Sequence, residues 1–91
     1  MSYHHVGFKV IGTIKATRGK CMYGHKVGDV LELDAHDASN LCGFFFHDLF
    51  PYILMLQFGG KFPDSWGGDV LEFDCMDKAN AVTIELRREK R

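Results

Sequence analysis

The stretch GDVLELD at residues 28–34 recurs almost unchanged as GDVLEFD at residues 68–74, and the likeness extends to Asn40 and Asn80. Each copy begins with a Gly-Asp turn and continues with alternating apolar and polar residues, the pattern of a half-buried strand. The loops before the two copies, CMYGHKV and KFPDSWG, share no chemistry. We therefore interpret the repeat as architecture, with two similar strands, rather than as a duplicated ligand site.

The repeat also pairs four acidic residues that are candidates for function, Asp29 with Asp69 and Glu32 with Glu72. In the first copy the alternation predicts Leu31 and Leu33 facing the core, with Val30, Glu32 and Asp34 facing outward.

Two further strands flank the repeat. FKVIGTIKAT at residues 8–17 and NAVTIELRRE at residues 80–89 both alternate apolar with polar positions. With a helical segment between the second and third strands, the predicted order is β-β-α-β-β. The expected fold is α+β with two layers, an antiparallel sheet covered on one face by a Pro-kinked helical segment.

The helical segment lies between two turn signals. Asp37, Ser39 or Asn40 can cap its start, and Gly59 or Gly60 can supply a left-handed stop. Proline inside a helix removes a hydrogen bond and clashes with the preceding turn. We therefore predict two short helices, 39–49 and 51–58, separated at Pro51.

This segment is apolar all round, whereas a helix on one sheet needs only one apolar stripe. Its large apolar residues are Phe44, Phe45, Phe46, Leu49, Phe50, Tyr52, Ile53, Leu54, Met55, Leu56 and Phe58. A second copy of the chain is the simplest source of additional cover, so a homo-oligomer is expected. The alternative is that Pro51 redirects the second helix and one monomer buries both.

The totals exclude several classes of function. The chain has 91 residues, enough for a single domain over 1–91, and a net charge of -1, which argues against general nucleic-acid or acidic-membrane binding. The N-terminal MSYHHVGFKV lacks the features of a secretory signal, and the apolar stretch at 41–60 contains His47, Asp48 and Pro51, which a membrane span disfavours. Three cysteines, an odd number, predict a reducing compartment, the cytoplasm.

Three motifs carry a family resemblance: CMYGHKVGD, LCGFFFHDLFPYILMLQFGGKFP and the late cysteine of FDCMD before VTIELRR. They resemble the CPxGHKxGD loop, the GLCxxxFHxLYPYxxxLxxGG helix and the late cysteine of an uncharacterised family of small prokaryotic repeat proteins. The likeness covers nearly the whole chain and departs at Met22 and Met76, where the family pattern has proline. It implies no particular activity. The residues that match its motif positions are Cys21, His25, Cys42, His47 and Cys75.

Thiolate and imidazole are the ligands that zinc and iron–sulfur clusters prefer. Cys21, His25, Cys42 and Cys75 would form a closed set if the fold gathered them. The spacing gives no support, because such sites usually carry cysteines about two to four residues apart. The alternative is that Cys42 and Cys75 are small buried apolar residues.

Cys21 differs from the other cysteines because it lies in a Gly-rich loop beside Lys20, His25 and Lys26. Positive neighbours favour the thiolate and raise reactivity, so Cys21 is a candidate nucleophile or ligand-binding thiol. His47 is a tempting base for Cys42, but five helical residues place the two about 140° apart around the axis.

We therefore expect a small homo-oligomeric binding or accessory protein. Its ligand would sit where the CMYGHK loop meets the helix start and the KFPDSW loop. The candidate ligand-binding residues are Cys21, His25, Lys26, His47 and Trp66. The alternatives are a zinc or iron–sulfur protein and, ranked last, a thiol-dependent enzyme using Cys21.

Overall fold

A computed structural model describes residues 6–21 and 23–90 of the chain. The elements are β1 Lys9–Ala16, β2 Val30–Leu33, α1 Gly43–Gln57, the single-turn 3-10 helix η1 Asp64–Trp66, β3 Val70–Asp74 and β4 Thr83–Glu89. The four strands form one antiparallel sheet in the order β2-β1-β4-β3. The predicted α+β class with an antiparallel sheet is therefore confirmed, and η1 is an element that the sequence did not predict.

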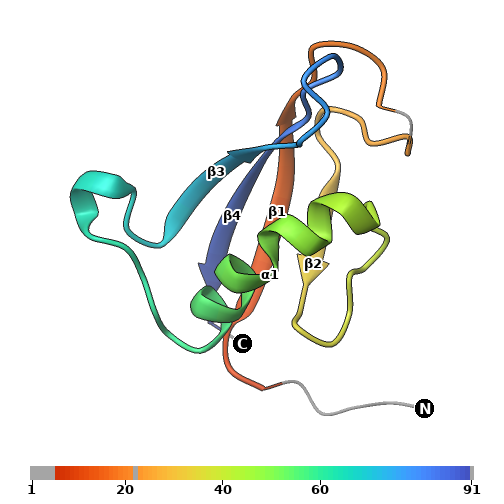
Figure 1. Ribbon diagram of the computed structural model, residues 1–91. Coiled ribbons are helices and arrows are strands. Elements are labelled where there is room, and N and C mark those ends of the chain that lie inside the picture. Colours follow the sequence, from red (N-terminus) through yellow and green to blue (C-terminus); the bar gives the residue numbers. More distant parts are fainter. Residues whose placement is uncertain (1–5, 22, 91) are drawn as a thin grey trace.

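The two copies of the heptad form the two edges of this sheet. β2 pairs only with β1, and β3 pairs only with β4 (Figure 1). Each edge strand is then followed by a turn in which an aspartate side chain accepts a backbone N–H two residues on, at 2.8 Å for Asp37 and 3.1 Å for Asp77. The repeat thus encodes an edge strand and its exit turn.

The core lies between α1 and the face of the sheet that it covers (Figure 1). The helix contributes Phe45, Leu49, Ile53 and Leu56, and the strands contribute Val10, Ile14, Leu33, Leu71, Ile84 and Leu86. At Gly12 an added Cβ would lie 2.9 Å from both Ile84 Cδ1 and Leu33 Cδ1, so a side chain there would displace the core.

The prediction of two helices is wrong, because α1 runs without interruption through Pro51. Proline removes the bond to the carbonyl four residues back, here that of His47. Pro51 and His47 both lie on the exposed side of α1, where water can satisfy that carbonyl. The helix therefore tolerates the proline instead of breaking.

The ends of α1 agree with the sequence only at the C-terminus. Cys42 is the N-cap and makes no side-chain capping bond, so the prediction of Asp37, Ser39 or Asn40 as the cap is wrong. Those residues form the preceding turn instead, with Asn40 at a φ of 69°. At the other end Gly59, with a φ of 92°, and Gly60 close the helix with N–H bonds to Leu56 and Met55, as predicted.

The outer face of α1 remains apolar and exposed. Phe44 is 71% exposed, Phe58 58%, Leu54 39% and Phe50 36%, and Asp48 is the one formally charged residue of the helix. α1 has 15 residues, and none of the helices in residues 6–21 and 23–90 combines the length and apolar character needed to cross a membrane. The expectation that one sheet cannot cover the whole helix therefore agrees with its exposed face.

Candidate functional site

His25 joins the long loop before β2 to the start of α1. Its Nε2 accepts the N–H of Cys42 at 3.1 Å, and its ring stacks on Tyr23 at a centroid distance of 4.9 Å. Burial lowers the pKa of His25 below its usual 6.5, and the Asp29 carboxylate opposes that shift. Because Nε2 accepts a hydrogen bond, the neutral imidazole carries its proton on Nδ1.

The loop adopts this conformation because of its glycines and of Asp29. Gly24 and Gly28 have φ values of 104° and 95°, a region that side chains disfavour. The Asp29 carboxylate accepts the N–H of Lys26 at 2.9 Å, and Gly24 donates to the carbonyl of Cys21 at 3.1 Å. The GHKVGD motif therefore works as a local turn that presents His25 to the helix.

The three cysteines come from distant segments and line one cavity of about 340 Å³. All three are free and partly exposed. The remaining wall residues are Tyr23, Phe44, Met76 and Asp77. The sequence suggested the three cysteines only as metal ligands. In the structure they line an open, largely apolar cavity.

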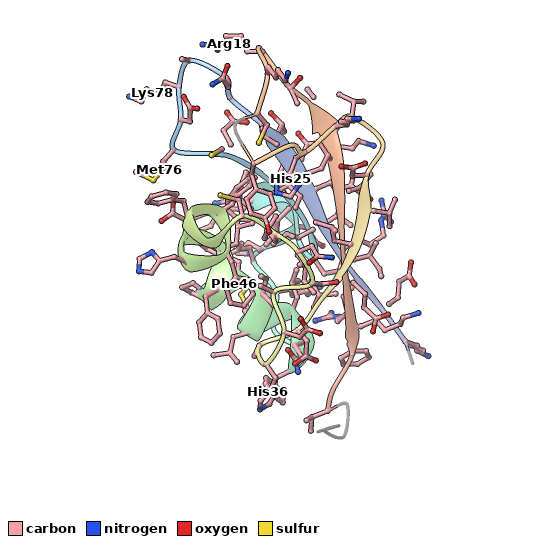
Figure 2. All side chains as sticks on the ribbon, turned by 90° about the vertical axis from the view of Figure 1, so that its right-hand side faces the viewer. Arg18, His25, His36, Phe46, Met76 and Lys78 are labelled. Carbon is pink, nitrogen blue, oxygen red and sulfur yellow. The ribbon has the colours of Figure 1, made fainter. Side chains whose placement is uncertain are left out.

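A larger hollow of about 760 Å³ adjoins this cavity and shares four of its wall residues, Tyr23, Cys42, Phe44 and Met76. It adds Gly43, His47 and Asp48 from the first turns of α1. Figure 2 shows His25 and Met76 toward this end of the molecule and His36 toward the opposite end. The thiols and the helix start therefore belong to one continuous site.

The loop after β3 forms the far wall of the cavity and is held in place by polar contacts. Hydrogen bonds from Asn80, first from its side chain and then from its backbone, lower the pKa of Asp77. Arg18 donates to the carbonyl of Lys78 at 3.0 Å, and both lie at the loop tips in Figure 2. Cys75 is fixed by its N–H bond to Val82 at 2.8 Å.

The structure does not assemble the predicted metal set. Across residues 6–21 and 23–90, no three His, Cys, Asp or Glu side chains lie close enough to hold one metal ion. Cys21, Cys42 and Cys75 share a cavity, whereas the Nε2 of His25 is occupied by the N–H of Cys42. The shared cavity of the three cysteines is the one observation in favour of a zinc or iron–sulfur site, which stays a prediction.

The other candidate ligand-binding residues are only partly brought together. The His47 side chain is 89% exposed beside Asp48, at 3.4 Å, and lines the larger hollow with Cys42. Lys26 is exposed and lines a third hollow, of about 360 Å³, with Cys21 and His25. Trp66 lies in η1 beyond the β3 edge and lines a different cavity, so the expected meeting of its loop with the CMYGHK loop is wrong (Figure 1).

The paired acidic residues do not form a joint site, because the two heptads lie on opposite edges of the sheet. Asp29 bonds its own loop, and Asp69 pairs with Arg88 at 3.3 Å. Glu32 and Glu72 lie on β2 and β3, the two outer strands. Their placement agrees with the interpretation of the repeat as architecture.

Sequence reasoning missed a buried polar cluster at the other end of the helix. Gln57 is fully buried and bonds Asp34 at 3.2 Å, Ala35 at 2.9 Å and Val6 at 2.9 Å. Asp34 is 3% exposed, so its predicted outward orientation is wrong. The reason is that β2 ends at Leu33, after which the chain turns and Asp34 points at the helix instead of continuing the strand alternation.

Arg88 is the second residue that the sequence did not single out. It donates to the carbonyls of Gly60, at 2.8 Å, and Leu56, at 3.4 Å, and its guanidinium lies 5.0 Å from the centroid of the Phe8 ring. It thus satisfies carbonyls at the C-terminal end of α1 from the last strand. The signal in the sequence was the alternation of β4, which places Arg88 on the same side of the strand as the buried Ile84 and Leu86.

Comparison of the chain with protein-family models, with curated proteins and with solved structures finds no match. The residues of the site itself must therefore indicate the function. Fold alone would not decide it in any case, because one architecture hosts many functions.

Proposed function

We propose that this protein is a small, self-associating binding or accessory protein whose ligand occupies the two adjoining hollows at the start of α1. The observation that carries the proposal is the convergence of Cys21, Cys42 and Cys75 on one apolar cavity. Ligand sites are typically hollows of about 300–1,000 Å³ with apolar walls and a few polar groups. Both hollows fall in that range, with thiols, His47 and two aspartates as their polar groups.

The wall chemistry favours a small, largely apolar ligand. Tyr23 and Phe44 supply aromatic surface, and Met76 and the thiols supply soft, polarisable sulfur. Asp48 lines the larger hollow and Asp77 the smaller one, and both carboxylates disfavour an anion. The ligand is therefore neutral or weakly cationic.

Self-association through the outer face of α1 is the second part of the proposal. A large aromatic side chain has a surface of about 150–250 Å². From their exposed fractions, the apolar surface left open on α1 is on the order of 400 Å² for Phe44, Phe50, Leu54 and Phe58 together. A stable interface buries about 800 Å² per partner. Tyr23 and Met76, 53% and 62% exposed at the cavity mouth, extend the face toward that area. A second copy is the proposed partner because an apolar face is complementary to itself under a two-fold axis.

The ligand site and the self-association face share Phe44 and His47. Both residues belong to the outer face of α1 and also line the larger hollow. A second copy on this face would therefore cover the mouth of the site. This links oligomerisation to ligand binding and excludes water from the bound ligand.

Sedimentation at micromolar concentration tests the self-association. We expect a dimer or larger species for the natural chain and a monomer for Leu54→Glu, which places a charge in the apolar face. Val30→Glu is the matched control, because Val30 is 63% exposed on the β2 edge, away from α1. A lone 10.3 kDa particle for the natural chain at every concentration would contradict this part of the proposal.

Titration with an apolar fluorescent dye tests the site. Phe44→Ser should weaken dye binding about tenfold, since it removes a large aromatic contact from both hollows. Val30→Ser is the control and should bind the dye as the natural chain does. Equal affinities for Phe44→Ser and Val30→Ser would place the dye elsewhere and remove the support for the site.

The metal-binding alternative keeps one supporting observation, the shared cavity of the three cysteines. Metal analysis of protein purified without oxygen tests this alternative. Less than about a tenth of an equivalent of zinc or iron per chain would contradict it. The thiol enzyme ranks last because the nearby His25 already accepts a hydrogen bond. Cys21 alkylated by iodoacetamide no faster than free cysteine would leave that alternative without support.

The compartment and the family complete the proposal. Three free cysteines suit the reducing cytoplasm, and no nucleic-acid or membrane partner is proposed for a chain with a net charge of -1. Membership of the family with the CPxGHKxGD and GLCxxxFHxLYPYxxxLxxGG motifs is supported by Cys21, His25, Cys42, His47 and Cys75. Of its two departures, Met76 lies on the cavity wall, and Met22 lies outside the described residues.

A further inference from the structure

A second cavity lies beyond the β3 edge and contains three aromatic residues. It measures about 420 Å³, and its aromatic walls are Phe62, Trp66 and Phe73. Tyr52 extends the aromatic row behind them, with its ring centroid 4.5 Å from that of Phe73 and 6.0 Å from that of Phe62. None of these residues lines the hollows at the start of α1, so this cavity is independent of the function proposed above.

Trp66 is 70% exposed although its loop is firmly held. Its own N–H bonds the carbonyl of Pro63 at 2.8 Å, and Phe62 donates to Gly68 at 3.0 Å across the loop. Gly67 and Gly68 adopt φ values of 115° and 67° that make this turn possible. A large ring held on a preorganised loop costs little conformational entropy when it binds a ligand.

The charge around the cavity favours a cation. Glu72 is the only charged residue in the wall, and it has no ion-pair partner in the described part of the chain. Its cross-strand neighbour is Glu85, a second carboxylate, whose ion pair is with Arg87 at 3.4 Å. Two like charges opposite each other in adjacent strands repel, so the cross-strand neighbour of Glu72 does not neutralise its charge.

We propose that this cavity binds a methylated ammonium group, with Trp66 and Phe62 as its aromatic contacts and Glu72, on the edge strand β3, as its counter-ion. Aromatic faces attract cations, and tryptophan does so most strongly. A methylated ammonium has an apolar surface that suits these walls, and a single positive charge that suits one carboxylate. The group comes either from a free quaternary amine or from a methylated lysine of a partner.

Trp66 is the only tryptophan of the chain, so its fluorescence reports on this cavity directly. Choline should give a saturable change. Its neutral isostere, in which carbon replaces the nitrogen, should bind at least about tenfold more weakly, since it fills the same space without the charge. Equal affinities for the two, or no saturable change with choline, would overturn the proposal.

Two variants and a matched control assign the contacts. Glu72→Gln and Phe62→Leu should each weaken choline binding about fivefold to tenfold. Glu32→Gln changes the equivalent residue of the other heptad, on β2, and should bind as the natural chain does. If Glu32→Gln weakened choline binding as much as Glu72→Gln does, general charge attraction would explain the binding. That result would contradict the proposed site.

A trimethyl-lysine peptide and its unmodified lysine counterpart separate the two sources. Tighter binding of the trimethyl-lysine peptide than of choline would assign the site to a modified partner protein. Equal binding would assign it to a free quaternary amine. Preference for the unmodified peptide would contradict the proposed ligand chemistry, and circular dichroism of each variant confirms that the fold is retained.

Discussion

His25 shows how a residue type associated with chemistry serves structure in this chain. Its position in a Cys/His-containing loop made it a candidate ligand, yet its Nε2 accepts the N–H of the N-cap residue of α1. The sequence could identify the residue but not this partner, because Cys42 is 17 residues away and no local pattern reports such a contact. The cysteines illustrate the same limit, since their spacing gives no indication that they line one cavity.

The lowered pKa of His25 predicts a stability that depends on pH. Below pH 6.5 the unfolded chain protonates this histidine more readily than the folded chain does. The free energy of unfolding should therefore fall as the pH decreases from 7 toward 5, with a slope of at most about 1.4 kcal/mol per pH unit from this group. Above pH 7 this contribution should be constant.

Urea denaturation at several pH values measures the effect. His25→Gln should reduce the slope, because the replacement has no titrating group. His47→Gln is the matched control and should keep it, since the His47 side chain is 89% exposed. A slope that disappears with His47→Gln and persists with His25→Gln would contradict the assignment.

Gln57 is the residue on which most buried polar contacts depend. Gln57→Leu should lower the free energy of unfolding by about 2–4 kcal/mol, since it removes the hydrogen-bond partner of Val6 and Ala35 and one partner of the buried Asp34 carboxylate. Chemical denaturation provides the measurement. Leu54→Gln, a change on the exposed side of the same helix, is the comparison, and an equal effect of both would contradict the role of the buried amide.

At the scale of elements, the strands were more predictable than the helix. Alternation located β1, β2, β3 and β4, because a half-exposed strand places every second residue in the core, although β2 ends before Asp34. The continuity of α1 through Pro51 was not predictable in the same way. Whether a proline interrupts a helix depends on which side it faces, and that orientation is a property of the packed molecule.

Pro51→Ala should stabilise the protein. The replacement restores an N–H that can bond the carbonyl of His47 and removes a residue unfavourable inside a helix, worth about 1–3 kcal/mol. Thermal unfolding followed by circular dichroism should show a higher Tm. Pro63→Ala, which changes a proline outside α1, should give no comparable increase. A lower Tm for Pro51→Ala would show that the ring itself is needed on the outer face.

At the scale of the whole molecule, the class of fold was predictable, and the placement of the candidate site residues was predictable only in part. The loop before β2 meets the start of α1, as expected, because β2 leads into the turn before the helix. Trp66 does not join them, because η1 precedes β3, whereas the loop that follows the other end of β3 lines the cavity. Strand order in a sheet depends on long-range pairing, which the local pattern of one sequence does not report.

Self-association would also make stability depend on concentration. Because a partner that binds only the folded chain stabilises it, the Tm should rise as protein concentration increases. Differential scanning fluorimetry over a hundredfold range of concentration would detect this rise. Leu54→Glu should have a constant Tm over that range, and a constant Tm for the natural chain would contradict the proposed dimer.

The repeated heptad also restricts how large an assembly can grow. An outer strand offers unpaired backbone groups to any other strand, and such contacts can continue without limit into a fibre. Here the two edge strands are nearly the same in sequence, and each carries a glutamate, Glu32 on β2 and Glu72 on β3. Joining edge to edge would bring carboxylates together, so polymerisation by strand addition is disfavoured. The proposed pairing through the outer face of α1 would instead occupy that face in one contact and give a closed dimer.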